Sequence, residues 1–218
     1  MPDVVTIASG GELRTTGEGP DAVVCVNGGG RAEVEGTWSA SIEWLVERLA
    51  PRFPGLRFGE VRYRVKSWQR LDLCVEDGLA ALASLGPRRT LMLGFSMGGA
   101  VSVRLARDPS VWSVVALAPW LPDRVDFSPM DGKRLAIIHG ALDSPLPGIP
   151  GVTAKSSRRA FERAVARGVD GTYTLIRGAL HGVAVRSPLG GSTIPLPRAS
   201  AWLAHVSDEI TRFQEAGA

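Results

Sequence analysis

One stretch decides the fold: Leu91-Met92-Leu93-Gly94-Phe95-Ser96-Met97-Gly98-Gly99-Ala100, an apolar run that ends in Gly94-x-Ser96-x-Gly98 and leads into a helical pattern. A chain that leaves a buried strand and enters a helix at once must turn sharply, so the serine at the turn projects from the sheet edge. The glycines two residues before and after Ser96 remove side chains that would collide there. The pattern therefore predicts a nucleophilic serine at position 96. The alternative is a glycine-flanked serine in an ordinary tight turn.

The composition is that of a single globular domain spanning residues 1–218. Its 25 basic and 22 acidic residues leave a formal charge of only +3, and the arginines are scattered, so we expect no nucleic-acid partner. No signal peptide is visible and no apolar run is long enough to span a membrane, which predicts a cytoplasmic protein without a membrane partner. Cys25 and Cys74 stand apart in apolar patterns, so we expect reduced core thiols.

Strand and helix patterns alternate along the chain from residue 22 onward. The expected strands are 4–7 and 12–15, which form an N-terminal hairpin, and then 22–26, 58–63, 90–93, 111–117, 135–140 and 172–176. The expected helices are 42–49 (capped by Thr37 or Ser39), 71–85, 100–106, 154–167 and 202–213. This alternation predicts an α/β fold, a mostly parallel twisted sheet with helices on both faces. Residues 119–133, only 15 in number, are too few for a helical cap domain.

Four groups of residues stand just past the ends of expected strands: Asn27-Gly28-Gly29-Gly30, Ser96, Asp143 and His181. In a parallel sheet the carboxyl ends of the strands meet at one edge, and ligands gather there. We therefore expect a functional site at that edge.

His181 is the candidate base among three histidines. A serine hydroxyl is a poor nucleophile until a neighbouring base takes its proton. His139 ends an apolar strand beside Gly140 and is expected to be a structural histidine, and His205 is expected to be solvated on the last helix. His181 lies in a glycine-flanked loop past a strand, where no core or helix role explains it. A surface loop histidine is the alternative.

Asp143 is the candidate acid, since a base of this kind needs an acceptor that fixes its tautomer and stabilises the imidazolium. It follows a strand and opens a loop, 144–151, rich in proline and glycine. A simple turn residue is the alternative, and Asp123 and Asp126 are the fallback acids. The order Ser96, Asp143, His181 is the one expected when a serine turn of this kind carries catalysis.

Attack on an acyl carbonyl creates an oxyanion, which preorganised N–H donors stabilise by on the order of 3 kcal/mol per donor. The backbone N–H of Met97 follows the serine and begins a helix, whose dipole has the right sign. A second donor is expected from the backbone of Gly28 and Gly29, where a side chain would block the approach of a ligand.

These motifs together resemble the α/β-hydrolase superfamily, of the small capless kind similar to carboxylesterases and dienelactone-hydrolase-like proteins. The resemblance rests on Asn27-Gly28-Gly29-Gly30, Gly94-Phe95-Ser96-Met97-Gly98-Gly99, His139-Gly140-Ala141-Leu142-Asp143 and Leu180-His181-Gly182. It implies an eight-stranded, largely parallel sheet and hydrolysis through an acyl-enzyme. Two departures matter. The family often has His-Gly where this chain has Asn27-Gly28; because the donor belongs to the backbone, this change leaves it intact. Dienelactone hydrolases use cysteine as the nucleophile where this chain has serine, and the serine favours ester or thioester chemistry.

Without a cap, the substrate pocket must be built from loops near the strand ends. Aromatic residues there are as often plain packing as pocket walls, and the candidates are Trp120, Trp38, Trp68, Tyr63 and the side chain of Met97. The loop 183–196 is expected to fold over the site as a small flap, since Gly190 and Gly191 permit motion.

The residues together predict a serine hydrolase that cleaves carboxylic esters of small or medium acyl substrates, its partner being a small-molecule ester. Thioesterase, acyltransferase and peptidase chemistry would use the same residues, because pocket shape selects the leaving group. A non-catalytic binding protein that kept the fold is the alternative from a different class. No His/Cys/Asp cluster has metal-ligand spacing, and glycines 28–30 lack the dinucleotide-binding frame, so we expect neither metal nor cofactor.

Overall fold

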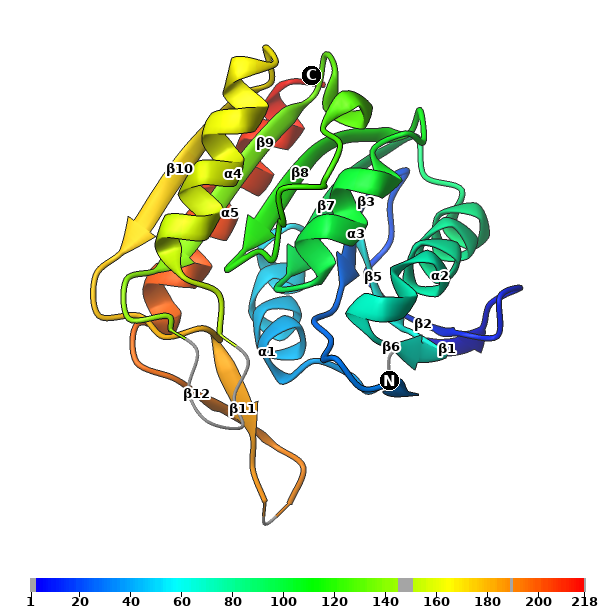
Figure 1. Cartoon of the computed structure of the whole chain (residues 1–218). Helices are drawn as coiled ribbons and strands as arrows, with labels where there is room; N and C mark the ends of the chain where they lie inside the picture. Colours follow the sequence, from blue (N-terminus) through cyan, green and yellow to red (C-terminus); the bar gives the residue numbers. More distant parts are fainter. Residues whose placement is uncertain (1–2, 145–150, 189, 218) are drawn as a thin grey trace.

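The computed structural model of the chain describes residues 3–144, 151–188 and 190–217. Within these residues an eight-stranded sheet forms the centre of the molecule, in the order β1-β2-β5-β3-β7-β8-β9-β10 (Figure 1). The strands are β1 (Asp3–Thr6), β2 (Glu12–Thr16), β3 (Asp21–Val26), β5 (Leu56–Arg62), β7 (Arg89–Phe95), β8 (Val111–Leu117), β9 (Arg134–Gly140) and β10 (Asp170–Ile176). The predicted α/β fold and its eight strands are confirmed.

The strands from β5 to β10 in this order run parallel to one another. β1 and β2 form the predicted N-terminal hairpin and join β5 antiparallel at one edge of the sheet. The carboxyl ends of the parallel strands therefore lie together, at the lower side of Figure 1. Every residue of β3 is buried, as its unbroken apolar pattern predicts for a strand covered on both faces.

Helices cover both faces of the sheet (Figure 1). One face packs against α1 (Ala40–Leu49) and α5 (Ala199–Glu215), and the other against α2 (Leu71–Leu85), α3 (Gly98–Leu105) and α4 (Ala154–Ala166). The inward positions predicted for the last helix are all buried: Trp202, Leu203, Val206, Ile210 and Phe213. Of the two candidate caps of α1, Ser39 is the one that accepts the N–H of Ile42, at 3.4 Å.

Two small antiparallel pairs lie outside the main sheet. β4 (Val34–Glu35) pairs with β6 (Val65–Lys66) beside the glycine loop. β11 (Ala184–Arg186) pairs with β12 (Thr193–Pro195), so most of the expected flap loop 183–196 is a β-hairpin. Its tip projects away from the body of the molecule (Figure 1), and Arg186 ties its base to Glu43 of α1 at 2.6 Å. Residues at the base of the hairpin, Ala184, Val185 and Leu196, line a cavity together with His181, so the segment borders the site, and its closure over the site stays a prediction.

The connection between β8 and β9 contains a single short 3-10 turn, Ser128–Met130, and the described residues hold no cap domain, as predicted. None of the described helices is long and apolar enough to cross a membrane. Cys25 and Cys74 are buried free thiols, and burial raises the pKa of each. The greater part of the predicted proline-rich loop 144–151 lies outside the described residues.

Candidate active site

Ser96 sits at the sharp turn between β7 and α3 with a φ of +54°. A non-glycine residue in the left-handed region costs free energy, so the surrounding structure must hold it there. Its N–H donates to the carbonyl of Leu117 at 2.9 Å, and its own carbonyl accepts from the N–H of Trp120 at 2.8 Å. The neighbouring strand β8 and its loop thus fix the strained residue, and its hydroxyl stands at the carboxyl edge of the sheet.

The two glycines that flank Ser96 are required by close backbone contacts. A Cβ atom on Gly94 would lie 2.3 Å from the carbonyl oxygen of Gly98, and one on Gly98 would lie 2.4 Å from that of Val26. Both obstacles are backbone atoms, which cannot move aside as a flexible side chain can. The turn is therefore open only to glycine at these positions, which is the physical reason for the Gly94-x-Ser96-x-Gly98 pattern.

Ser96, His181 and Asp143 form a continuous chain of hydrogen bonds. The Ser96 Oγ lies 3.1 Å from His181 Nε2, and His181 Nδ1 lies 2.7 Å from Asp143 Oδ2. Because a carboxylate only accepts, Nδ1 carries the proton of the neutral ring, which leaves Nε2 free to accept the serine proton. The three predicted residues thus come together in the geometry that activates a hydroxyl.

The Asp143 side chain is completely buried, and both of its oxygens are occupied. Oδ1 accepts the N–H of Val152 at 3.1 Å, and Oδ2 accepts from His181 and also from Nε2 of His139, at 2.9 Å. Burial alone would raise the pKa of this carboxyl, but the hydrogen bonds from His139 and His181 outweigh it and hold the pKa below its ordinary value. The acid is therefore a stable anion opposite the imidazole.

His139 does more than the structural role predicted for it. Its side chain is fully buried, and Nε2 lies 2.8 Å from the carbonyl of Val152 as well as 2.9 Å from Asp143. Both partners are acceptors, so Nε2 must carry the proton. Among the described residues Nδ1 has no partner. The contact of His139 with Asp143 was not predicted. The signal available in the sequence was the spacing of four residues between them, across the end of the strand.

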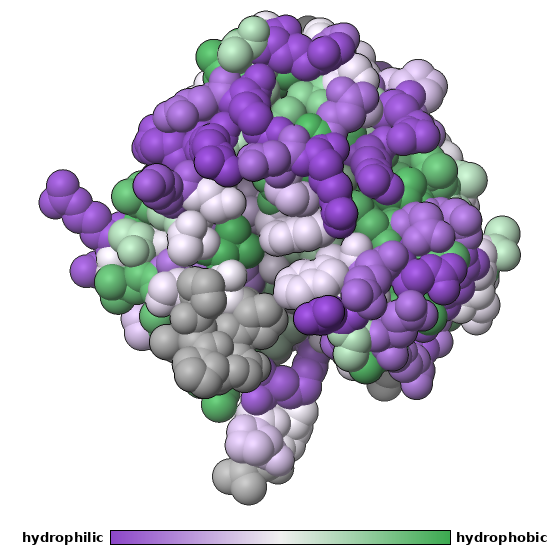
Figure 2. Space-filling view, viewed as in Figure 1, coloured by the Kyte–Doolittle hydropathy of each residue, from purple (hydrophilic) through white to green (hydrophobic). Residues whose placement is uncertain are grey.

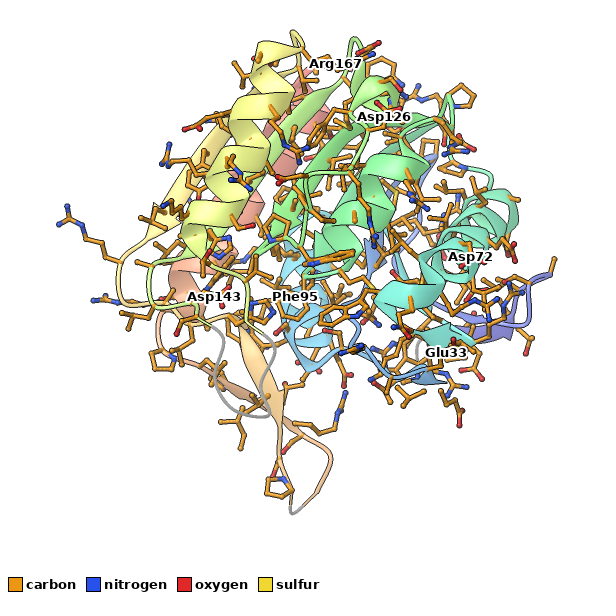
Figure 3. The ribbon with its side chains drawn as sticks, viewed as in Figure 1. Glu33, Asp72, Phe95, Asp126, Asp143 and Arg167 are labelled. Atoms are coloured by element: carbon orange, nitrogen blue, oxygen red, sulfur yellow. The ribbon has the colours of Figure 1, made fainter. Side chains whose placement is uncertain are left out.

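The other candidate acids and the third histidine do not enter this chain. Asp123 pairs with Arg159 at 2.8 Å, and Asp126 accepts the N–H of Ser128 at 2.9 Å. Figure 3 shows Asp126 at the end of the sheet opposite to Asp143 and Phe95. His205 is half-buried on α5, where it lines a small cavity between α5 and the sheet.

A cleft of about 880 Å³ opens in front of Ser96 and His181. Its walls come mainly from the glycine loop, the segment leading into α1 and the end of β6, and two of the predicted aromatic residues, Trp38 and Trp68, line it. In the space-filling view, pale, near-neutral residues lie in the middle of the molecule, with hydrophilic residues above them and hydrophobic ones to either side (Figure 2).

Three predicted pocket residues, Tyr63, Trp120 and Met97, do not line the cleft, and the prediction was wrong for each. Tyr63 is only 2% exposed, and its hydroxyl donates inward to the carbonyl of Asn27 at 3.3 Å. Trp120 stacks behind Trp68, with ring centroids 5.7 Å apart, and supports the wall rather than forming it. The sequence indicated which loops meet, but the direction of each ring depends on its neighbours in space. Met97 is fully buried beneath Gly29, whose added Cβ would lie 2.7 Å from the Met97 sulfur.

Three backbone N–H groups near Ser96 have no acceptor within the described part of the chain: those of Met97, Gly28 and Gly29. Both glycines line the cleft beside the serine. A Cβ on Gly28 would lie 3.2 Å from Cβ of Ser96, so the absence of a side chain lets this loop approach the serine closely.

On the other side of His181 lies a second, mostly apolar cavity of about 420 Å³. Leu142, Leu180 and Val185 contribute to its walls, and Phe95 borders both cavities. Phe95 also packs on the imidazole of His181, with ring centroids 5.2 Å apart. This contact of the residue before Ser96 with the candidate base has no signal in the sequence. His181 and Phe95 therefore stand between two spaces of different character, and Ser96 lines only the first.

Comparison with solved structures identifies the architecture. A sugar hydrolase from Lactococcus lactis superposes with a TM-score of 0.71 at 16% identity, covering 99% of each chain. A thermophilic esterase from the Planctomycetes species Thermogutta terrifontis gives a TM-score of 0.66 at 17% identity, covering 99% of this chain and 92% of that one. An alpha/beta hydrolase enzyme from a Medee basin deep-sea metagenome library gives 0.62 at 18% identity, covering 84% of each chain.

No protein-family model and no curated protein matches the sequence. At identities of 16% to 18%, the structural similarities bear on architecture rather than on activity. Together with the parallel sheet and the serine turn at its carboxyl edge, they show that the chain has the α/β-hydrolase fold.

Proposed function

We propose that the protein is a serine hydrolase that cleaves carboxylic esters of small or medium acyl substrates. The observation that carries the proposal is the hydrogen-bond chain Ser96–His181–Asp143 at the mouth of a cleft. A structural serine at a tight turn needs no partner of this kind, whereas a nucleophile needs a base and the base needs an anion. The neighbouring folds described as esterases are consistent with ester bonds as the target.

In the proposed acylation step, the Ser96 Oγ bonds to the carbonyl carbon of the ester while His181 Nε2 takes the hydroxyl proton. Asp143 stays ionised and stabilises the imidazolium that forms, as its lowered pKa favours. When the tetrahedral intermediate collapses, the carbon–oxygen bond of the alcohol breaks and the imidazolium gives its proton to the leaving oxygen. Water then repeats the sequence on the acyl-enzyme and releases the acid.

The negative charge of the intermediate needs donors at a fixed place. The N–H groups of Met97, Gly28 and Gly29 are the candidates, because they border Ser96 and have no acceptor within the described residues. Removal of one donor from such a site typically costs about 10²–10³ in kcat. In a strand-turn-helix of this kind, the N–H of the residue after the serine is the usual first donor, which supports Met97 as a candidate.

A fluorophosphonate probe tests the nucleophile directly. The wild-type protein should be labelled and should hydrolyse members of a p-nitrophenyl ester panel, while Ser96→Ala should not be labelled and should lose activity by at least about 10⁴-fold. His181→Ala is the second variant, and circular dichroism checks that both variants fold. Equal labelling of wild type and Ser96→Ala would contradict the proposal. A wild type without turnover on any ester would favour the binding-protein alternative.

A further inference from the structure

The wall of the cleft that continues from the glycine loop carries positive charge. Among the described residues lining the cleft, Arg31 and Lys66 are the only permanent charges, and no Asp or Glu is present. The protein as a whole is close to neutral, with a formal charge of +3 over 218 residues. The cleft lining therefore carries a local excess of positive charge, which the overall composition of the protein does not explain.

Within the described residues, the neighbouring carboxylates form ion pairs with other arginines and not with these two cations. Glu33 and Glu35 belong to the same loop as Arg31, but Glu33 pairs with Arg70 at 3.5 Å and Glu35 with Arg62 at 3.1 Å. Arg31 forms no ion pair within the described residues, and Lys66 donates to the neutral hydroxyl of Thr37 at 2.7 Å.

The backbone that carries the two cations is held in place. The N–H of Trp68 donates to the carbonyl of Gly30 at 3.0 Å, and the Ser67 hydroxyl donates to the carbonyl of Arg31 at 3.0 Å. Val34 of β4 pairs with Lys66 of β6. The cations thus stand on one cross-linked wall rather than on two independent loops, which lowers the entropy lost when both engage a single ligand.

The two cavities assign the two halves of an ester. His181, which would protonate the leaving oxygen, lines both cavities, whereas Ser96 lines only the cleft, so the apolar cavity beside Leu142 and Leu180 is the space left for the alcohol. An acyl group bonded to the Ser96 Oγ would lie in the cleft, whose wall includes Gly29, Gly30 and Arg31, because Ser96 lines the cleft and not the apolar cavity. The cations are therefore placed for the acyl half of the substrate, and the apolar cavity for the alcohol half.

We propose that the cleft selects esters whose acyl chain ends in a carboxylate, with Arg31 and Lys66 binding that carboxylate and an apolar alcohol as leaving group. The inference rests on the proposed hydrolase function and adds the substrate class. Hydrolysis of such a monoester releases a dicarboxylic acid and a neutral alcohol, so the product carries one more negative charge than the substrate.

Matched ester pairs test this selection. Mono-p-nitrophenyl esters of succinic, glutaric and adipic acid are each compared with their methyl-capped counterparts, which lack the free carboxylate, after subtraction of the uncatalysed rate. At low salt the wild type should prefer at least one free acid by about three- to tenfold in kcat/KM, since each partly exposed ion pair contributes about one and a half- to fivefold. The preference should fall on raising the salt from about 0.05 to 0.5 M, because mobile ions screen it.

Variants identify the residues responsible. Arg31→Gln with Lys66→Met should remove the preference while leaving kcat/KM for the methyl-capped esters within about twofold. Arg104→Gln with Arg107→Gln is the matched control, since it also removes two charges, at the far end of α3 from Ser96, and should keep the preference. This control distinguishes a loss of preference caused by the two cleft residues from one caused by the change in net charge.

The outcomes separate the two proposals. Equal or lower rates for all free acids, with the methyl-capped esters still hydrolysed, would overturn the substrate class and leave the hydrolase function standing. A preference retained in the Arg31→Gln, Lys66→Met variant would also overturn it. Failure to hydrolyse any ester, in either form, would overturn the hydrolase proposal and this inference with it.

Discussion

The two sides of the candidate site differ in how firmly they are built. On the acid side, the Asp143 carboxylate is fully buried and three N–H groups occupy its oxygens. On the cleft side, Arg31 and Lys66 are at least partly exposed, and Trp38 and Trp68 are half-buried. The side that would move protons is buried with its side-chain oxygens occupied, whereas on the side that would meet the substrate the backbone is cross-linked but the side chains are open to solvent. Preorganisation matters most where charge develops, whereas binding tolerates looser contacts.

The largest effect should follow from Asp143→Asn. The amide cannot stabilise an imidazolium and favours the wrong tautomer of His181, so we expect kcat on a p-nitrophenyl ester to fall by about 10³–10⁴-fold. Asp123→Asn is the matched control, because Asp123 pairs with Arg159 away from the site and its loss should change kcat less than about twofold. A similar loss in both variants would contradict the assignment of the acid.

A smaller effect on the same side should follow from His139→Leu. Leucine removes the hydrogen bond to the charged Asp143, and such bonds correspond to about 10- to 100-fold in kcat. His139→Gln keeps an N–H donor and should recover most of the activity. Thermal unfolding monitors stability, and KM should change little because His139 does not line the cleft. Equal losses in both variants, with matched stability, would show that the hydrogen bond has no part in positioning Asp143.

On the cleft side, Trp68→Ala should act on binding. Its ring lines the cleft and stacks on Trp120, so its removal should raise KM about three- to tenfold and leave kcat nearly unchanged. Trp112→Ala is the control. Trp112 is 45% exposed near the start of β8, whereas the site lies at the carboxyl end of that strand. A drop in kcat with unchanged KM would mean that the two sides of the site are not separable.

The smallest effect concerns stability at low pH. Although burial opposes it, the hydrogen bonds from His139 and His181 lower the pKa of Asp143 in the folded protein. The resulting stabilisation is fully present above the unfolded value, near 4, and is lost as the pH falls through the folded pKa. The Tm difference between wild type and Asp143→Asn should therefore shrink as the pH falls below about 4. A difference that stays constant there would contradict the lowered pKa.

Predictions from the sequence succeeded where local rules apply and failed where side-chain direction matters. The buried runs of β3 and β7 and the glycines around Ser96 follow from short-range sterics, so the strands and the serine turn were predictable. The hairpin of β11 and β12 was missed because its segments are only three residues each. Tyr63 was expected in the pocket but points inward to Asn27, a contact between segments 36 residues apart.

By itself, the sequence determined the order of strands and helices and the chemistry available at the sheet's edge. Hydrophobic periodicity and glycine sterics act over a few residues, and parallel strands bring their carboxyl ends together. Only the tertiary structure decided that His139 shares Asp143 with His181, that Trp120 supports Trp68, and that two unneutralised cations face the cleft. Each of these depends on distances between segments far apart in the chain, which periodicity does not encode.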